Sequence, residues 1–224
     1  MEKKHTSKSF AEELDLLETR VDEMGRVCIE QLSRAMKALE DRDSELAASI
    51  NHRDKVINAM QTVIDDQTVR ILALRHPVAQ DLRVIIAGLR MANDFERIAD
   101  YSANIARRIP DVNHRPFSET MDLLLEMGTA ALEMLNDVLY AFRERDAATA
   151  VDVWHRDDRI DEIYSQVLTN IRDLMAENAE NVTPCTALLL VARCCERIGD
   201  HVVNVARDVH FIINGEMYRG EPED

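Results

Sequence analysis

The stretch "CCERIGDHVVNVARDV" at residues 194–209 repeats, with small changes, the stretch "DFERIADYSANIARRI" at residues 94–109. Residues 96–107 and 196–207 are identical at seven of twelve positions. Both stretches place an Asp four residues after a Glu, and residues four apart lie on one face of a helix. Each stretch therefore predicts a helix that carries an acidic stripe.

The similarity between the two halves of the chain extends upstream of these stretches. Residues 21–57 match residues 124–160 without a gap, with 13 identities in 37 positions. A heptad pattern alone would not preserve particular short pieces, so the match predicts a duplicated unit. The preserved pieces are Glu-Met-Gly at 23–25 and 126–128, Arg-Asp at 42–43 and 145–146, and His-Arg-Asp at 52–54 and 155–157.

The composition favours helices throughout the chain. The 224 residues include only 6 Gly and 5 Pro, and 4% are aromatic, whereas a sheet protein needs more aromatic and β-branched residues. Apolar residues recur at helical spacing in every long segment. Prolines and polar stretches separate these segments and predict six helices. The helices are expected near residues 10–41, 44–75, 79–109, 117–144, 147–178 and 184–213.

The duplication and the helix pattern together predict an all-α fold of two tandem, pseudo-symmetric three-helix bundles. The first bundle is expected at residues 10–109 and the second at residues 117–216, joined by a short polar linker. Polar stretches around Asp43 and Asp146, which occupy equivalent positions, are expected to hold turns. Each bundle then ends in a helix with an acidic stripe.

The net charge of −15 excludes several kinds of partner. An acidic surface cannot neutralise nucleic acid or anionic lipid, so we expect neither nucleic-acid binding nor membrane insertion. The longest apolar runs, such as residues 187–192, are far too short to span a bilayer, and the N-terminal residues lack the apolar core of a secretory signal. We therefore expect a cytoplasmic protein.

The acidic stripes are candidate metal sites. Glu96 and Asp100 form the first stripe, and Glu196 and Asp200 form the second. Small residues run beside both stripes, which lets a neighbouring helix approach closely. Burying crowded carboxylates without partners is costly, so such a seam needs either an Arg or a bound cation.

The second helix of each repeat adds oxygen ligands at the same spacing. These are Asp54 and Asn58 in the first half and Asp157 and Asp161 in the second. If this helix packs antiparallel to the third, its ligands meet the acidic stripe. Oxygen ligands without His or Cys favour Mg, Mn, Ca or oxygen-ligated Fe over structural zinc. Because Asn58 replaces the acid found at Asp161, the first site is expected to bind metal more weakly or not at all.

A simpler interpretation of the stripes is ion pairing at a solvated helix face. Arg97 and Arg197 each follow the Glu of a stripe and can pair with its acids. The two halves also differ beside the stripe, since Ala99 stands where the second half has Gly199. Both interpretations, a metal site and Arg pairing, stay open at the level of sequence.

Five pieces of the chain, in this order and spacing, resemble the PhoU family of phosphate-specific transport system accessory and regulatory proteins. The resemblance covers residues 10–216 or so. Its pieces are the paired "EMG" segments at 23–25 and 126–128, "HPVAQDLR" at 76–83, "ERIAD" at 96–100, "ERIGDHVVNVA" at 196–206 and "VHFIINGE" at 209–216.

The resemblance implies a function and a set of partners. Family members are six-helix, non-enzymatic negative regulators of the phosphate-starvation response and of phosphate uptake. They act between the ATPase subunit of the phosphate ABC transporter and a membrane sensor histidine kinase, often as homodimers. The resemblance also implies divalent or trivalent metal ions, with Fe, Mn, Mg, Zn and Ca as candidates. The matching ligands are Glu96, Asp100, Glu196 and Asp200, with Asp54, Asn58, Asp157 and Asp161 as partners on the preceding helix.

Two other classes of function are alternatives to this regulatory role. A di-iron or di-manganese bundle enzyme normally uses Glu-x-x-His motifs on paired helices, but the one such motif in the chain runs from Glu2 to His5. A helical spacer without a site would leave the acids as surface residues, and replacing them with alanine would then leave signalling unchanged.

Overall fold

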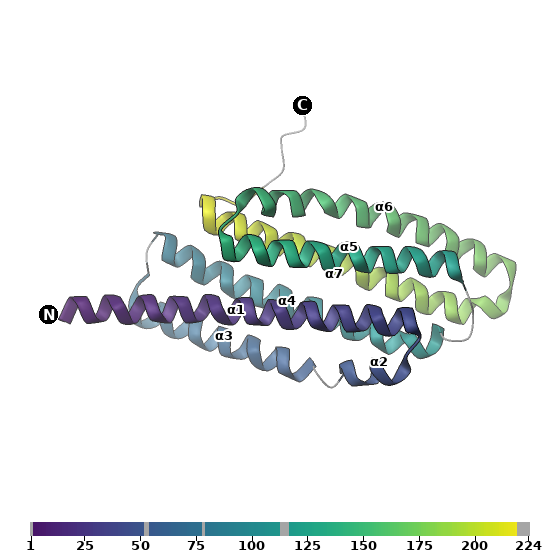
Figure 1. Cartoon of the computed structure of the whole chain (residues 1–224), viewed down its shortest axis with the longest axis horizontal. Helices are drawn as coiled ribbons and strands as arrows, with labels where there is room; N and C mark the ends of the chain where they lie inside the picture. Colours follow the sequence, from purple (N-terminus) through teal and green to yellow (C-terminus); the bar gives the residue numbers. More distant parts are fainter. Residues whose placement is uncertain (1, 52–53, 78, 113–116, 219–224) are drawn as a thin grey trace, which may run out of the picture.

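The computed structural model is built almost entirely of long helices (Figure 1). It describes residues 2–51, 54–77, 79–112 and 117–218, except the side chains of residues 2–8, 51 and 54. This part of the chain contains no strand, which confirms the all-α prediction. The elements are α1 (Glu2–Asp41), α2 (Ser44–Asn51), α3 (Asp54–Arg75), α4 (Ala79–Val112), α5 (Ser118–Glu144), α6 (Ala147–Glu177), a 3₁₀ turn η1 (Ala179–Asn181) and α7 (Val182–Asn214).

The predicted helices correspond to these elements with three main differences. The helix expected from residue 10 already begins at Glu2. The helix expected at 44–75 is described as α2 and α3, on either side of residues 52–53, which lie outside the described residues. The helix expected to end at 109 continues through Pro110 to Val112. Val112 is buried with 1% of its surface exposed, so packing of this apolar side chain outweighs the helix-breaking tendency of the proline.

The repeated Arg-Asp pairs end one helix and begin the next. Arg42 and Arg145 both have positive φ angles, 55° and 56°, in the left-handed conformation that commonly ends a helix. The following Asp caps the new helix, since Asp43 Oδ1 accepts from two backbone amides, 2.9 Å away in each case. Asp146 Oδ1 accepts from the amides of Ala148 and Thr149 in the same way. The turns predicted at both positions are confirmed.

The helices of the first half form one layer, and the helices of the second half form a second layer that faces it (Figure 1). In the first half, α2 and α3 pack on α1 and α4, and in the second half α5, α6 and α7 pack on one another. Contacts between α4 and α7 and between α1 and α5 join the halves. The apolar core is continuous through both halves, so the two sets of helices bury their apolar faces together.

The two helices at the centre, α4 and α7, run antiparallel. Arg90 near the start of α4 pairs with Asp208 near the end of α7. The rings of Tyr101 and His201 meet between these helices, with their centroids 5.7 Å apart. These two residues occupy equivalent positions in the repeat, and equivalent residues meet where a two-fold axis crosses a helix pair.

Two repeated glycines explain why the Met-Gly pieces match between the halves. A Cβ at Gly25 of α1 would lie 2.8 Å from Leu139 Cδ1 of α5, and a Cβ at Gly128 of α5 would lie 2.6 Å from Met36 Sδ of α1. A methyl group at either position would require the Leu139 or Met36 side chain to shift. The glycines therefore let α1 and α5 approach closely where the halves meet.

Candidate functional site

Four of the predicted ligands come together between α6 and α7. Asp157 and Asp161 lie on α6, and Glu196 and Asp200 lie on α7. Burial, followed by the charges of Asp161 and Asp200, raises the pKa of Asp157 to about 7. Burial and then Asp200 also raise the pKa of Asp161. These carboxylates thus lie close enough to repel one another, and part of the group is removed from water.

The glycine at position 199 makes room for Asp157. A Cβ there would lie 2.5 Å from Asp157 Oδ1 and 3.1 Å from Ile160 Cδ1. The carboxylate of α6 therefore rests directly against the backbone of α7. Ala99, which occupies the equivalent position in α4, is fully buried, so the first half fills this space with a methyl group.

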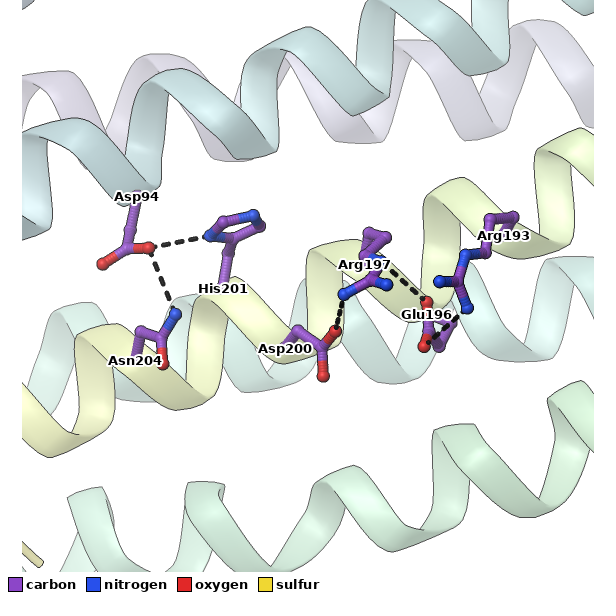
Figure 2. A network of polar contacts seen from close by, with 7 residues as sticks. All are labelled: Asp94, Arg193, Glu196, Arg197, Asp200, His201 and Asn204. Carbon is purple, nitrogen blue, oxygen red and sulfur yellow. Dashed lines mark hydrogen bonds and ion pairs between the residues drawn. The ribbon is translucent and has the colours of Figure 1, made fainter.

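Arginines neutralise part of the cluster (Figure 2). Arg193 lies 3.1 Å from Glu196 Oε1, and Arg197 lies 3.0 Å from Asp200 Oδ2 and 3.6 Å from Glu196 Oε2. Glu196 Oε2 is buried and has no hydrogen-bond partner among the described residues. Burial and then the charge of Asp200 raise the pKa of Glu196, although both arginines oppose the shift. The Arg pairing predicted as an alternative is present and leaves one buried oxygen atom without a donor.

In the first half, the described acids of the stripe lie beside Arg97. Glu96 and Asp100 lie 3.5 and 3.8 Å from the Arg97 guanidinium. Asn58 is exposed on α3, and its backbone carbonyl accepts from the Thr62 hydroxyl. The side chain of Asp54, the remaining predicted ligand, lies outside the described residues.

The donor chemistry of the second cluster fits a hard cation. The second cluster contains four carboxylates, and Glu196 Oε2 is buried without a hydrogen bond among the described residues, with Arg197 Nε 3.6 Å away. Carboxylate oxygens are the ligands that Mg²⁺, Ca²⁺ and Mn²⁺ prefer. As the described side chains stand, no three His, Cys, Asp or Glu residues converge closely enough to hold an ion. Arg197 occupies part of the space beside Asp200. Binding therefore requires Arg197 to release Asp200.

A second polar contact joins the two halves and was not predicted from the sequence. Figure 2 shows Asp94 of α4 between His201 and Asn204 of α7. Asp94 Oδ1 lies 2.7 Å from His201 Nδ1 and 3.4 Å from Asn204 Nδ2, and Asp94 is 8% exposed. No spacing rule pairs residues 107 positions apart. The signal in the sequence was a difference between the two halves: position 94 holds an acid, whereas the equivalent position of the second half holds Cys194.

The fold and the site define a class of protein: an all-helical chain with two related halves and a carboxylate cluster between the last two helices. A family model described as the PhoU domain matches residues 21–109 and again residues 124–209. The chain belongs to the PhoU family, as its resemblance predicted.

Individual relatives agree with this assignment over nearly their full length. The phosphate-specific transport system accessory protein PhoU homolog of Xylella fastidiosa (strain Temecula1) is 38% identical over 95% of this chain and 88% of its own. The PhoU homolog of Rhizobium meliloti is 33% identical over 98% of this chain and 94% of its own.

A solved structure shares the fold. The crystal structure of the phosphate transport system regulatory protein PhoU from Streptococcus pneumoniae has a TM-score of 0.87 and 31% sequence identity, covering 94% of this chain and 99% of that one. The relatives are named accessory or regulatory proteins rather than enzymes. Within the described residues, no helix is long and apolar enough to cross a membrane.

Proposed function

We propose that this protein is a non-enzymatic negative regulator of the phosphate-starvation response and of phosphate uptake. The observation that carries the proposal is the full-length similarity to proteins named as accessory or regulatory components of phosphate transport. An adaptor needs surfaces that contact its partners and a means of changing those surfaces.

The proposal includes partners and a location. The protein acts in the cytoplasm, between the ATPase subunit of the phosphate ABC transporter and a membrane sensor histidine kinase, as a homodimer. When phosphate is plentiful, it biases the kinase toward its phosphatase state. Residues 10–109 and 117–216 are the two repeats of this adaptor. The net charge of −15 supports docking on basic partner surfaces.

The proposal also includes a divalent or trivalent metal ion at the second cluster. Asp157, Asp161, Glu196 and Asp200 would hold it, and an ion bound there supplies positive charge that offsets their mutual repulsion. Arg193 and Arg197, which are 45% and 41% exposed, are free to turn toward water when they leave the acids. The first-half residues Glu96, Asp100, Asp54 and Asn58 would bind more weakly.

The regulatory proposal is tested by deleting the gene and measuring a reporter of phosphate-starvation genes in high phosphate. We expect the reporter to be active in the deletion strain and silent again when the wild-type gene is restored. Glu196→Gln/Asp200→Asn should restore silence poorly, whereas Glu96→Gln/Asp100→Asn should restore it better. Immunoblots check that the variants accumulate equally. A reporter that stays silent in the deletion strain would contradict the proposal.

A further inference from the structure

A groove of about 480 Å³ lies between α1 and α3, in the first half of the chain. Its apolar lining comes from α3 and consists of Val56, Ala59, Met60 and Val63. Val56 and Val63 are 52% and 44% exposed, so the fold leaves much of this apolar surface in contact with water. An exposed apolar patch of this kind marks a site of contact with another molecule.

The apolar lining belongs to a regular stripe along α3. Positions 56, 60, 63, 67, 70 and 74 are separated alternately by four and three residues, which is the spacing of the seam between paired helices. Four of the six positions are apolar, and Leu74 at the far end is 62% exposed. At 1.5 Å per residue the stripe spans about 27 Å. Its spacing and length suit a helix that packs along it.

The repeat identifies the surface of the second half that corresponds to this groove. The offset of 103 residues that relates residues 21–57 to residues 124–160 also matches the buried positions of α3 and α6, since Ile57 and Ile64 correspond to Ile160 and Val167, all 0% exposed. The same offset matches the exposed positions: Val56 with Arg159 and Val63 with Gln166.

The second half covers this surface with an ion-paired arginine. The Arg159 guanidinium donates to Glu126 at 2.7 Å and to Glu162 at 3.1 Å. Glu126 corresponds to Glu23, which lines the groove of the first half. A repeat of this fold therefore does not require an apolar side chain at the position of Val56, and the apolar surface of the first half points to a contact outside the chain.

The charges beside the groove favour a second copy of this chain as its occupant. Two chains of net charge −15 repel each other, unless they meet where that charge is locally offset. The groove carries two cations, Arg20 and Lys55, and one anion, Glu23. A two-fold interface brings the same patch together from both copies, so each anion can face a cation of the other copy. A basic partner surface is not favoured at a groove with more cations than anions.

We propose that α1 and α3 form the interface between two copies of this chain, with the apolar stripes packed together about a two-fold axis. The inference rests on the homodimer of the proposed function and assigns its surface. The two copies of α1 and α3 then make a four-helix bundle with an apolar seam. The helices α3 and α6 lie at opposite edges of the molecule (Figure 1), so this interface leaves α6 accessible to other partners.

Sedimentation equilibrium of the full chain at several concentrations tests the proposal, because it gives the dissociation constant of the dimer. We expect the wild type to be a dimer. Val63→Glu should raise the dissociation constant at least about a hundredfold, since each copy would bury an unpaired carboxylate. Gln166→Glu is the matched control. It adds the same charge at the equivalent exposed position of α6 and should leave the constant unchanged.

A second variant keeps the fold by using the arrangement of the other half. Val56→Arg introduces the residue type found at position 159, opposite Glu23 instead of Glu126. The variant should therefore unfold like the wild type, and it should also weaken the dimer, because a guanidinium replaces an apolar group in the seam. Far-UV circular dichroism and thermal unfolding check the fold of every variant.

Three results would overturn the inference. A wild-type dimer that both Val63→Glu and Val56→Arg leave intact refutes this surface alone and keeps the homodimer of the proposed function. Equal weakening by Val63→Glu and Gln166→Glu would show that added charge, and not the α3 stripe, causes the loss. A wild-type chain that stays monomeric contradicts the homodimer as well. If Val63→Glu then also fails to silence the phosphate-starvation reporter, the groove takes a different protein.

Discussion

At the scale of single residues, the buried carboxylate of Asp208 lowers the stability of the folded protein when it is ionised. It is 3% exposed, and its ion pair with the half-exposed Arg90 is long at 3.4 Å. Burial raises the pKa of Asp208 to about 7, Arg90 lowers it, and the charge of Asp94 raises it further. The ionised form is therefore disfavoured in the folded state relative to the unfolded chain.

The sign of the resulting pH dependence follows from this pKa. Between about pH 4 and pH 7 the folded protein holds a proton on Asp208 that the unfolded chain has lost. The contribution of this group to the free energy of unfolding is therefore present at low pH and is lost as the pH rises through 7. Asp208→Asn removes the titration while keeping the shape of the side chain.

We expect Asp208→Asn to unfold at a higher temperature than the wild type at pH 8, with the difference vanishing toward pH 4. Thermal unfolding followed by circular dichroism in EDTA measures this, because EDTA removes the influence of metal. Arg90→Gln removes the ion pair and should lower the unfolding temperature at pH 8, because Arg90 favours the ionised form of the buried Asp208. An unchanged pH profile in Asp208→Asn would show that the carboxylate is ionised in the folded state without cost.

Some of these residue contacts could be predicted from the sequence and others could not. The meeting of Asp157 with Glu196 and Asp200 follows from helical spacing once the two helices are assumed to be antiparallel neighbours. The contact of Asp94 with His201 depends on where α4 crosses α7, which spacing within one helix does not determine. The Arg207 guanidinium lies over the Trp154 ring, 5.9 Å from its centroid, and this contact depends in the same way on how α6 and α7 pack.

At the scale of elements, the lack of a side chain at Gly199 of α7 allows the Asp157 carboxylate to lie against that helix. Alanine normally stabilises a helix interior relative to glycine by about 1 kcal/mol. At position 199 the new Cβ would meet Asp157 Oδ1 at 2.5 Å, so Asp157 has to move. At position 88 of α4 the nearest atom is Val21 Cγ2 at 3.5 Å, which is ordinary contact. The two glycines thus allow a matched comparison.

We expect Gly88→Ala to raise the free energy of unfolding by about 1 kcal/mol. Gly199→Ala should gain less stability and should bind metal more weakly than the wild type, because Asp157 is displaced. Urea unfolding gives the stabilities, and calorimetric titration with Mn²⁺ gives the affinities. Equal metal affinity in Gly199→Ala and the wild type would show that Asp157 is not a ligand.

The helices could largely be predicted, because short-range features of the sequence determine where each helix begins and ends. The Arg-Asp pairs act through a left-handed residue and a capping carboxylate, both short-range effects that the sequence displays. The extension of α4 past Pro110 was not predictable, because it depends on burial of Val112 in the folded protein.

At the scale of the whole molecule, the halves are held together where α1 crosses α5. A Cβ at Gly128 would lie 2.6 and 2.8 Å from Met36 Sδ and Cγ. Gly128→Leu should lower the free energy of unfolding by about 1–3 kcal/mol through overpacking. Urea unfolding at equilibrium measures this loss.

A double-mutant cycle separates this crowding from a general loss of structure. Met36→Ala alone should cost about 2–5 kcal/mol, because it leaves a cavity in the core. In the Gly128→Leu background the same change should cost much less, since the new leucine fills the space. Strictly additive costs would show that α1 and α5 do not press together at this point.

We propose that the acidic cluster of the second half binds a metal ion more tightly than the first-half residues do. Calorimetric titration of Mn²⁺ into the wild type, Glu196→Gln/Asp200→Asn and Glu96→Gln/Asp100→Asn at pH 8 tests it most directly. We predict that the second-half variant loses the tightest site and that the first-half variant keeps it. Equal Mn²⁺ affinity in all three proteins, or loss only in the first-half variant, would contradict the claim.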